Sequence, residues 1–440
     1  MKALLQAASL VAILASANGA IAADRSAGPQ SVNGRWDAVL SRNGVDIPFR
    51  LDIKGQGPTL KGVFYDGFKP YDGTTGATFQ DGKLVLNIEH YLTTINATFA
   101  HGELTGTLAT QGRGPSGDYS FEATRHVNAP AGHSHAPKIA GTWVIPLEAP
   151  SSKGEKAFRF VVQQRGAEVA AAILRVDGDT GSYSGTFQDG KWVLSHFDGG
   201  RPGLIIVTPR PDGSLEIQQH VEAHGAANIT DGGRAAVLTA YRSDVAQAKG
   251  LPAPDNFLTH TTARDPNGVF KFAFPDMEGK LVTNDDPRFK GKVVLAVVSG
   301  TWCPNCHDEA RYLVELDRKY RSKGLAIVDF DFEEPDQQSS LERERAFNKQ
   351  YGVQYTSLLA GQPSEMHQKV PQLDHLDTWP ATIFIGRDGK VRAIHAGFAS
   401  PATGKFNTEL KQEFTNRIEQ LLAEKPGPDT AAVNTARHAE

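Results

Sequence analysis

Cysteine is almost absent from this chain: its 440 residues include only Cys303 and Cys306, three positions apart. A disulfide-stapled scaffold needs several cysteines and a four-cysteine zinc site needs four, so both are excluded. A charge excess is also missing, because 46 basic residues stand against 50 acidic ones. Proteins adapted to nucleic acid carry a clear basic excess, and we therefore expect no nucleic-acid partner.

Long hydrophobic runs are missing after the N-terminus, where residues 1–22 have the pattern of a secretory signal peptide. Lys2 supplies the positive start, residues 3–15 the apolar stretch and residues 20–22 the small-residue cleavage pattern. A membrane-spanning helix needs about 20 apolar residues, so we expect no transmembrane anchor, a short N-terminal anchor helix being the alternative. We predict an exported protein, periplasmic if the source is bacterial and secreted otherwise.

The first half of the predicted mature chain is β-rich and internally duplicated. Alternating apolar and polar residues, with Asn-Gly and Asp-Gly pairs between them, predict antiparallel hairpins. We expect two β modules, residues 31–127 and 138–245, each a small sandwich or barrel, with Trp36, Trp143, Phe79 and Phe187 in their cores. Three segments recur in order at a spacing of 107 to 109 positions: GRW at 34–36 and GTW at 141–143, FRL at 49–51 and FRF at 158–160, and TFQDGK at 78–83 and 186–191.

Strands and helices alternate in the second half, which predicts an α/β domain over residues 255–424. Compositional linkers at 126–137 and 247–254 separate the three parts, and the tail at 425–440 is expected to be disordered. The expected elements are strands at 292–299, 325–332, 381–385 and 391–396, and helices at 305–323, 339–351 and 410–423.

The two cysteines lie where the apolar strand 292–299 gives way to the predicted helix 305–323. Because a helix N-terminus stabilises an anion, we expect a lowered pKa for the Cys303 thiol, which would attack a disulfide. Cys306, deeper in the helix, would then resolve the mixed disulfide. A C-x-x-C pair at a strand-to-helix junction predicts redox function, with a structural disulfide or a half zinc site involving His307 as alternatives.

Several motifs lie within residues 255–424: KGKVV at 290–294, GTWCPNC at 300–306, Glu309 three positions after the second cysteine, and Pro380 followed by GRDGK at 386–390. Together they resemble the TlpA/ResA-like exported thiol-disulfide oxidoreductases, which have the thioredoxin fold. The resemblance implies that Cys303 is the nucleophile and Cys306 the resolving thiol. It also implies that Glu309 tunes the dithiol or relays protons, and that Pro380 is a cis proline shaping the substrate groove.

Trp302, Pro304, Trp379 and Pro380 are therefore the candidate groove residues. Trp379 is bulkier than the residue that the family usually carries before the proline. His307 replaces a basic residue, and it is either a group that titrates near physiological pH or a solvated helix position. For Glu309 the alternative is an ordinary exposed carboxylate.

The implied enzyme is a protein disulfide reductase whose only cofactor is its own redox-active Cys303–Cys306 disulfide. Residues 304–305 add no positive charge, which favours a reductase over an oxidase. Its partners would be protein disulfides and a thiol reductant, which we expect to be membrane-bound. We predict no bound metal.

Two other functions remain open at this stage. A peroxiredoxin-like thiol peroxidase shares the fold, although Gly300 stands where that family has threonine before its cysteine. Alternatively, the β modules bind a ligand or partner and the redox domain is an accessory. In that case five histidines could bind a metal, the alternative being that they are solvated residues of a linker or a strand. They are His126, His133, His135, His220 and His224.

Overall fold

The computed structural model describes residues 31–424 except 111–117, 128–135, 180, 201, 222–235 and 335–339. The predicted signal peptide and tail, together with His133, His135 and His224, lie outside the described residues. Val32–Glu440 forms one unit separate from Met1–Ser31. None of the helices in the described part of the chain has the length and apolar character needed to cross a bilayer.

The first β module is one nine-stranded antiparallel sheet, a half-barrel that stays open at β4 and β5. Its order, β4-β3-β2-β1-β9-β8-β7-β6-β5, pairs chain neighbours except where β1 meets β9. Buried and outward side chains alternate along β1. The alternation predicted for residues 49–53 in β2 does not hold, because Asp52 is buried between Leu51 and Ile53 and pairs with Arg35 and Lys54. The strands are β1 (Gly34–Arg42), β2 (Val45–Lys54), β3 (Lys61–Asp66), β4 (Lys69–Gly73), β5 (Gly76–Gln80), β6 (Lys83–Ile88), β7 (Thr93–Ala100), β8 (Glu103–Thr110) and β9 (Tyr119–Arg125), with the 3-10 helices η1 (Gly57–Thr59) and η2 (Glu89–Tyr91) between them.

The second β module is a closed barrel in which each strand pairs with the next and β17 returns to β10. The sequence predicted either a sandwich or a barrel for each module. The structure shows an open half-barrel for the first module and a closed barrel for the second. The barrel strands are β10 (Gly141–Pro146), β11 (Ala157–Arg165), β12 (Glu168–Leu174), β13 (Tyr183–Gln188), β14 (Lys191–His196), β15 (Gly203–Pro209), β16 (Leu215–Val221) and β17 (Ala236–Arg242).

Both modules bury an equivalent tryptophan in their first strand, as the duplication predicted. The indole N–H of Trp36 donates to the Val32 carbonyl at 2.9 Å, and that of Trp143 donates to the Ile139 carbonyl at the same distance. Each ring is fully enclosed by its module core. The four-residue spacing of the two hydrogen bonds shows that the copies share local structure as well as sequence.

An arginine from the last strand of each module lies over that tryptophan. Arg125 is 4.1 Å from the Trp36 ring centre, and Arg242 is 4.0 Å from that of Trp143. The glycine two positions before each tryptophan has a positive φ and faces the arginine, so that a Cβ would lie about 2.5 Å from a guanidinium nitrogen. Only glycine fits there, which explains why the G-x-W triplet recurs.

The hairpin turns lie where the Asn-Gly and Asp-Gly pairs predicted them. Positive φ at both central residues is the condition for a type I′ turn, and Asn or Asp followed by Gly meets it readily. Both residues have positive φ at the three predicted turns: 43–44, 81–82 and 189–190.

The C-terminal part is an α/β domain around a five-stranded sheet of order β23-β22-β21-β25-β26. Its first three strands run parallel, and β25 and β26 are antiparallel to their neighbours. β21 is buried along its whole length, as expected for a strand covered on both faces. The strands are β21 (Val293–Ser299), β22 (Leu325–Phe332), β23 (Thr356–Gly361), β25 (Ala381–Ile385) and β26 (Val391–Ala396), and two short pairs flank them, β18 (Thr262–Ala263) with β24 (Leu373–Asp374) and β19 (Ala273–Pro275) with β20 (Leu281–Thr283).

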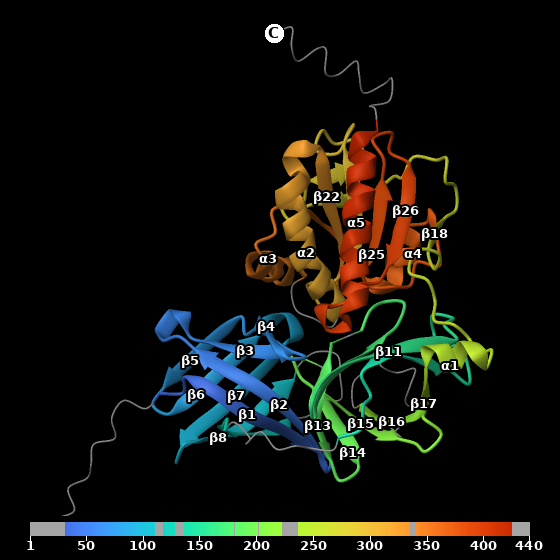
Figure 1. Cartoon of the computed structure of the whole chain (residues 1–440). Helices are drawn as coiled ribbons and strands as arrows, with labels where there is room; N and C mark the ends of the chain where they lie inside the picture. Colours follow the sequence, from blue (N-terminus) through green and yellow to red (C-terminus); the bar gives the residue numbers. More distant parts are fainter. Residues whose placement is uncertain are drawn as a thin grey trace, which may run out of the picture. The chain divides into compact units, whose positions relative to one another are not determined.

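Two long helices of this domain, α2 and α5, lie side by side against one face of the sheet (Figure 1). The Tyr312 hydroxyl of α2 donates to the Lys411 carbonyl of α5 at 2.8 Å. Their apolar sides pack on the side chains of β21 and β22 that point to this face. The helices are α1 (Ser243–Ala248), α2 (Pro304–Tyr320), α3 (Ser340–Tyr351), α4 (Met366–Lys369) and α5 (Lys405–Ala423), with 3-10 turns η3 (Arg321–Lys323), η4 (Pro363–Glu365) and η5 (Pro401–Thr403).

Several element boundaries differ from the expectation by one to five residues, and two of them have a local cause. The linker predicted at 247–254 begins inside α1, because that helix runs on from the last barrel strand. The final helix, predicted from 410, begins at Lys405, directly after Gly404 with its positive φ. The apolar periodicity that guided the prediction starts one turn later than the helical backbone.

We predict that Trp143→Ala lowers the free energy of unfolding by about 3–5 kcal/mol, because it leaves a large cavity in the barrel core. Val237→Ala in the same barrel is the control, since Val237 is exposed, and it should stay within about 0.5 kcal/mol of the wild type. Urea denaturation followed by circular dichroism measures both. Similar values for the two variants would contradict the assignment of Trp143 to the core.

Candidate active site

The two cysteines lie at the start of α2, directly after the buried central strand β21. Cys303 is the N-cap residue, with extended backbone, and Pro304 occupies the first helical position. The Cys306 N–H donates to the Cys303 carbonyl at 3.1 Å, which places both side chains in the first turn. Neither cysteine is in a disulfide, and their exposed fractions are only 3% and 2%.

The connection from β21 to α2 depends on Gly300. A Cβ at this position would lie 2.4 Å from the indole nitrogen of Trp302 and 2.7 Å from the Phe332 carbonyl. That indole N–H donates to the same carbonyl at 2.9 Å, which fixes Trp302 beside the dithiol. Glycine is therefore required so that the tryptophan can approach the neighbouring strand.

Burial separates the second cysteine from solvent and raises its pKa. The pKa of the Cys306 thiol is well above its usual value because of burial first, and then because of the hydrogen bond and charge of Cys303. Cys306 thus keeps its proton in the reduced protein, as suits a resolving thiol that acts second. The lowered pKa expected for Cys303 from its position at the helix N-terminus stays a prediction.

Glu309 is buried one turn further along α2 rather than exposed. The Thr382 hydroxyl donates to its Oε1, and its Oε2 has no hydrogen-bond partner among the described residues. The pKa of this carboxyl is raised to about 8, chiefly by burial: the Thr382 hydrogen bond lowers it and a charge on Cys303 contributes a smaller rise. Glu309 is therefore mostly protonated at neutral pH, and it lies three positions after Cys306 on α2.

The Trp379–Pro380 peptide bond is cis, as the family resemblance implied. The Cys303 thiol donates to the Trp379 carbonyl at 3.4 Å, so the proline loop faces the first cysteine. The rings of Trp302 and Trp379 meet edge to face at 5.2 Å. Of the four predicted groove residues, the two tryptophans thus form an aromatic cover around Cys303, and Pro304 is buried beneath the turn.

His307 is neither solvated nor titratable near physiological pH, which corrects both sequence interpretations. Its Nε2 lies 2.6 Å from the Thr301 carbonyl and its Nδ1 lies 2.6 Å from the Tyr351 hydroxyl. The hydrogen-bond partners assign the proton to Nε2, which donates to Thr301, while Nδ1 accepts from Tyr351. Burial, and then the charge of His90, holds the pKa of His307 well below its usual value.

Two functional neighbours of the dithiol escaped sequence reasoning, Asn305 and Asp308. The Asn305 amide donates to the Asp177 carbonyl of the barrel at 2.7 Å, and the Tyr71 hydroxyl of the half-barrel donates to the Asp308 carboxyl. Their partners lie more than 120 positions away in the chain. No local pattern signals such contacts, and only a folded structure brings them together.

Arg343 of α3 fixes the residue two positions before the first cysteine. Its guanidinium donates to the Thr301 hydroxyl at 2.8 and 3.0 Å and to the His90 carbonyl at 3.0 Å. Glu333 accepts the Thr301 N–H at 2.6 Å and lies 3.4 Å from Arg343. This buried network ties the turn before the dithiol to α3 and to the half-barrel.

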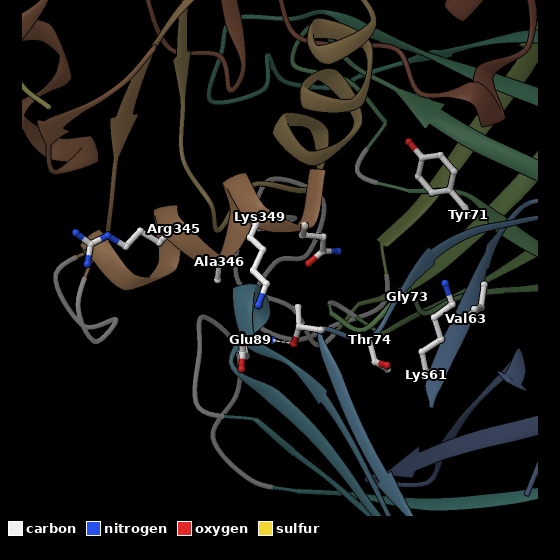
Figure 2. A pocket seen from close by; sticks show the side chains of 11 residues that line it. Lys61, Val63, Tyr71, Gly73, Thr74, Glu89, Arg345, Ala346 and Lys349 are labelled. Atoms are coloured by element: carbon white, nitrogen blue, oxygen red, sulfur yellow. Dashed lines mark hydrogen bonds between the residues drawn. The ribbon is translucent and has the colours of Figure 1, made fainter. Parts of the chain in front are cut away.

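A cavity of about 580 Å³ lies between the half-barrel and α3, on the far end of this network (Figure 2). Its charged lining is mainly basic, with Lys61, Arg345 and Lys349 against Glu89. Figure 2 shows the Lys349 side chain extending from α3 toward the half-barrel. Neither cysteine lines this cavity, so the dithiol does not open into it.

Metal ligation finds no support in the described residues, where no cluster of three or more His, Cys, Asp or Glu side chains could hold an ion. His126 Nδ1 lies 2.9 Å from the Asp37 carboxylate, and His220 belongs to β16. The other candidate histidines fall outside the described part.

Comparison with known proteins shows that residues 267–394 match the model of the AhpC/TSA family. The thiol-disulfide oxidoreductases ResA of Bacillus thuringiensis (strain Al Hakam) and Bacillus anthracis are each 32% identical over 120 residues. These matches cover 27% of this chain and 62% of each relative, so the chain spans a little less than two thirds of their length. ResA of Geobacillus kaustophilus is 27% identical over 189 residues, 43% of this chain and 96% of the relative.

Solved structures of similar proteins include a thiol:disulfide interchange protein of the thioredoxin family from Chlorobium tepidum TLS. It is 20% identical and covers 37% of this chain and 100% of its own, with a TM-score of 0.29. A thiol-disulfide oxidoreductase from Bacteroides fragilis is 18% identical and covers 32% and 99%, with a TM-score of 0.26.

We predict that Glu309→Gln changes the pH dependence of stability. The folded protein holds the Glu309 proton up to about pH 8, whereas the unfolded chain loses it near pH 4.5. The stability from this proton is therefore full below pH 4.5 and is lost as pH rises toward 8. Relative to the variant, the wild type should lose a few kcal/mol across that window, measured by urea denaturation at several pH values.

Glu315→Gln, on the exposed side of α2, is the matched control and should keep the wild-type pH profile. Parallel profiles for the wild type and Glu309→Gln would show that this carboxyl titrates as it does in water.

Proposed function

We propose that this protein is a thiol-disulfide oxidoreductase that reduces protein disulfides through Cys303 and Cys306. The observation that carries the proposal is the geometry of the dithiol: two cysteine thiols, not joined in a disulfide, lie in the first turn of α2, beside the cis-proline loop and on the same helix as a buried carboxyl with a raised pKa. The activity named for the ResA relatives, thiol-disulfide oxidoreductase, supports the same chemistry.

The first step is attack by the Cys303 thiolate on one sulfur of the substrate disulfide. A bond forms between Cys303 and that sulfur, the substrate S–S bond breaks, and the other substrate sulfur leaves as a thiolate that takes up a proton. Because Cys303 caps the helix, the partial positive charge of the N-terminus favours its thiolate. The Trp379 carbonyl beside its sulfur belongs to the loop against which we expect the substrate chain to lie.

The second step releases the substrate. Cys306 loses its proton, attacks the Cys303 sulfur and forms the Cys303–Cys306 disulfide, while the second substrate sulfur leaves as a thiol. The substrate gains two electrons and two protons in total, and the dithiol loses them. Glu309 in its carboxylate form, about one tenth of the molecules at pH 7, is placed to accept the Cys306 proton.

Regeneration then needs a thiol reductant from outside the chain, and we propose a membrane-bound donor. The N-terminal signal-peptide pattern supports export, with the periplasm as the site of action in a bacterial source. Trapping with Cys306→Ser tests the client: this variant should accumulate a mixed disulfide on Cys303, which Cys303→Ser as control cannot form. Failure to capture any protein in the native compartment would contradict a protein-disulfide substrate.

We predict a low reduction potential for the Cys303–Cys306 couple, because the two residues between the cysteines carry no positive charge to stabilise the thiolate strongly. Equilibration with glutathione buffers, read by thiol alkylation, measures it. A value near about −120 mV would indicate an oxidant instead. Peroxide consumption by the reduced protein, in the same preparation, would indicate the peroxidase alternative, and a biological role that survives Cys303→Ser would favour the binding function of the β modules.

A further inference from the structure

A loop of the barrel, residues 175–179, lies directly on the dithiol turn. The Asn305 side chain, which stands between the two cysteines, donates to the Asp177 carbonyl of this loop at 2.7 Å in a fully buried bond. A Cβ on Gly178 would lie 2.6 Å from the Asn305 side chain, so backbone and side chain are in direct van der Waals contact. The barrel loop thus covers the residue next to the reactive sulfurs.

The same loop also pairs with the segment that follows β26. Gly178 forms a parallel β-bridge with Phe398, whose N–H donates to the Asp177 carbonyl at 3.3 Å. The neighbouring Gly397 N–H donates to the Pro380 carbonyl at 2.8 Å, which joins this segment to the cis-proline loop. The loop therefore occupies a backbone-pairing position beside the proline loop that faces Cys303.

Several contacts hold the loop in place from both sides. The carboxylate of Asp177 is 2.6 Å from the Lys153 amine and 3.4 Å from the Arg175 guanidinium, within the barrel. On the opposite side, the Ser400 hydroxyl of the α/β domain donates to Asp179. Barrel residues Val161 and Leu174 belong to the same apolar core as α2 and α5.

The half-barrel holds the next residues of α2. Besides the Tyr71 bond to Asp308, the ring of His90 packs on His307 with 4.4 Å between ring centres. Arg343 bonds the His90 carbonyl from the other side. Both β modules therefore contact the first turn of α2, the turn in which Cys303 has an exposed fraction of 3%.

We propose that the barrel loop 175–179 determines which disulfides reach Cys303, favouring small molecules and flexible unfolded segments over disulfides on folded protein surfaces. This inference rests on the proposed function. Exchange requires an in-line approach of a substrate sulfur to the Cys303 sulfur, and the covered turn leaves no room for a folded surface. The loop must move away from α2 before attack, and a small movement admits only small or flexible substrates.

The position of Gly178 gives a direct test. Gly178→Ala places a methyl group 2.4 Å from the Phe398 carbonyl and 2.6 Å from Asn305, which forces the loop away from the dithiol turn. Gly213→Ala is the control, because Gly213 also has a positive φ, in another turn of the same barrel, with nothing within 4 Å of its Cβ position. Both substitutions carry a backbone cost, which is larger at Gly178 because φ is 121° there and 82° at Gly213, and only the first disturbs the loop.

Accessibility of Cys303 is measured by alkylation in the Cys306→Ser background, with iodoacetamide as the small reagent and a maleimide on a long polyethylene glycol chain as the large one. Gly178→Ala should raise the rate of the large reagent about tenfold, as expected when a minor open state becomes common, with a smaller gain for iodoacetamide. Gly213→Ala should leave both rates unchanged. Equal rates for the three proteins, or equal gains in the two variants, would overturn the proposal.

Ser400→Ala is a second variant in case Gly178→Ala fails to fold, because it removes the hydroxyl that Asp179 accepts. Ser400→Ala should also raise the rate at which the large reagent alkylates Cys303. An unchanged rate would contradict the proposal that the loop limits access to Cys303.

Exchange kinetics of the intact dithiol separate the two proposals. The reduced protein is mixed with oxidised glutathione and with a folded protein carrying a surface disulfide. Gly178→Ala should narrow the difference between the two rates. If alkylation depends on reagent size but the reduced protein exchanges with neither disulfide, the loop proposal is supported and the oxidoreductase proposal is contradicted. If the wild type exchanges with both disulfides at equal rates, the oxidoreductase proposal is supported and the loop proposal is contradicted.

Discussion

Burial of the first turn of α2 is the constraint on which the rest of this structure depends. It raises the pKa of Cys306 and of Glu309, so that the resolving thiol and the nearby carboxyl both hold protons at neutral pH. The same burial requires partners for the polar side chains of the turn, since an unpaired buried amide or carboxyl is costly. Asn305 and Asp308 find those partners in the β modules.

The β modules are therefore part of the environment of the dithiol, and the domain that carries the cysteines is not enclosed by its own residues alone. His307 illustrates this: Thr301 and Tyr351 satisfy its two nitrogens inside the α/β domain, while His90 of the half-barrel covers its ring. A histidine in water titrates near neutral pH, but one enclosed in this way stays neutral. The protonation states in the first turn of α2 therefore depend on the half-barrel, the barrel and the α/β domain together.

Much of the fold could be predicted from the sequence, because its signals are local. Asn-Gly and Asp-Gly pairs specify the hairpin turns, and the repeated G-x-W triplet marks the buried tryptophan of each module. The apolar run of β21 and the C-x-x-C pair after it located the candidate site. Whether a module closes is not local: it depends on whether the last strand reaches the first, as β17 does with β10.

The sequence by itself determined the chemistry available to this protein, because two cysteines three positions apart at a helix start can form and exchange one disulfide. It also determined the two β modules and the α/β domain, because the periodicity of strands and helices is set by residues that are close together in the chain. Only the tertiary structure decided how exposed the dithiol is. Gly178 meets Asn305 across 127 positions of chain, and such contacts arise from the packing of whole domains, which no local pattern encodes.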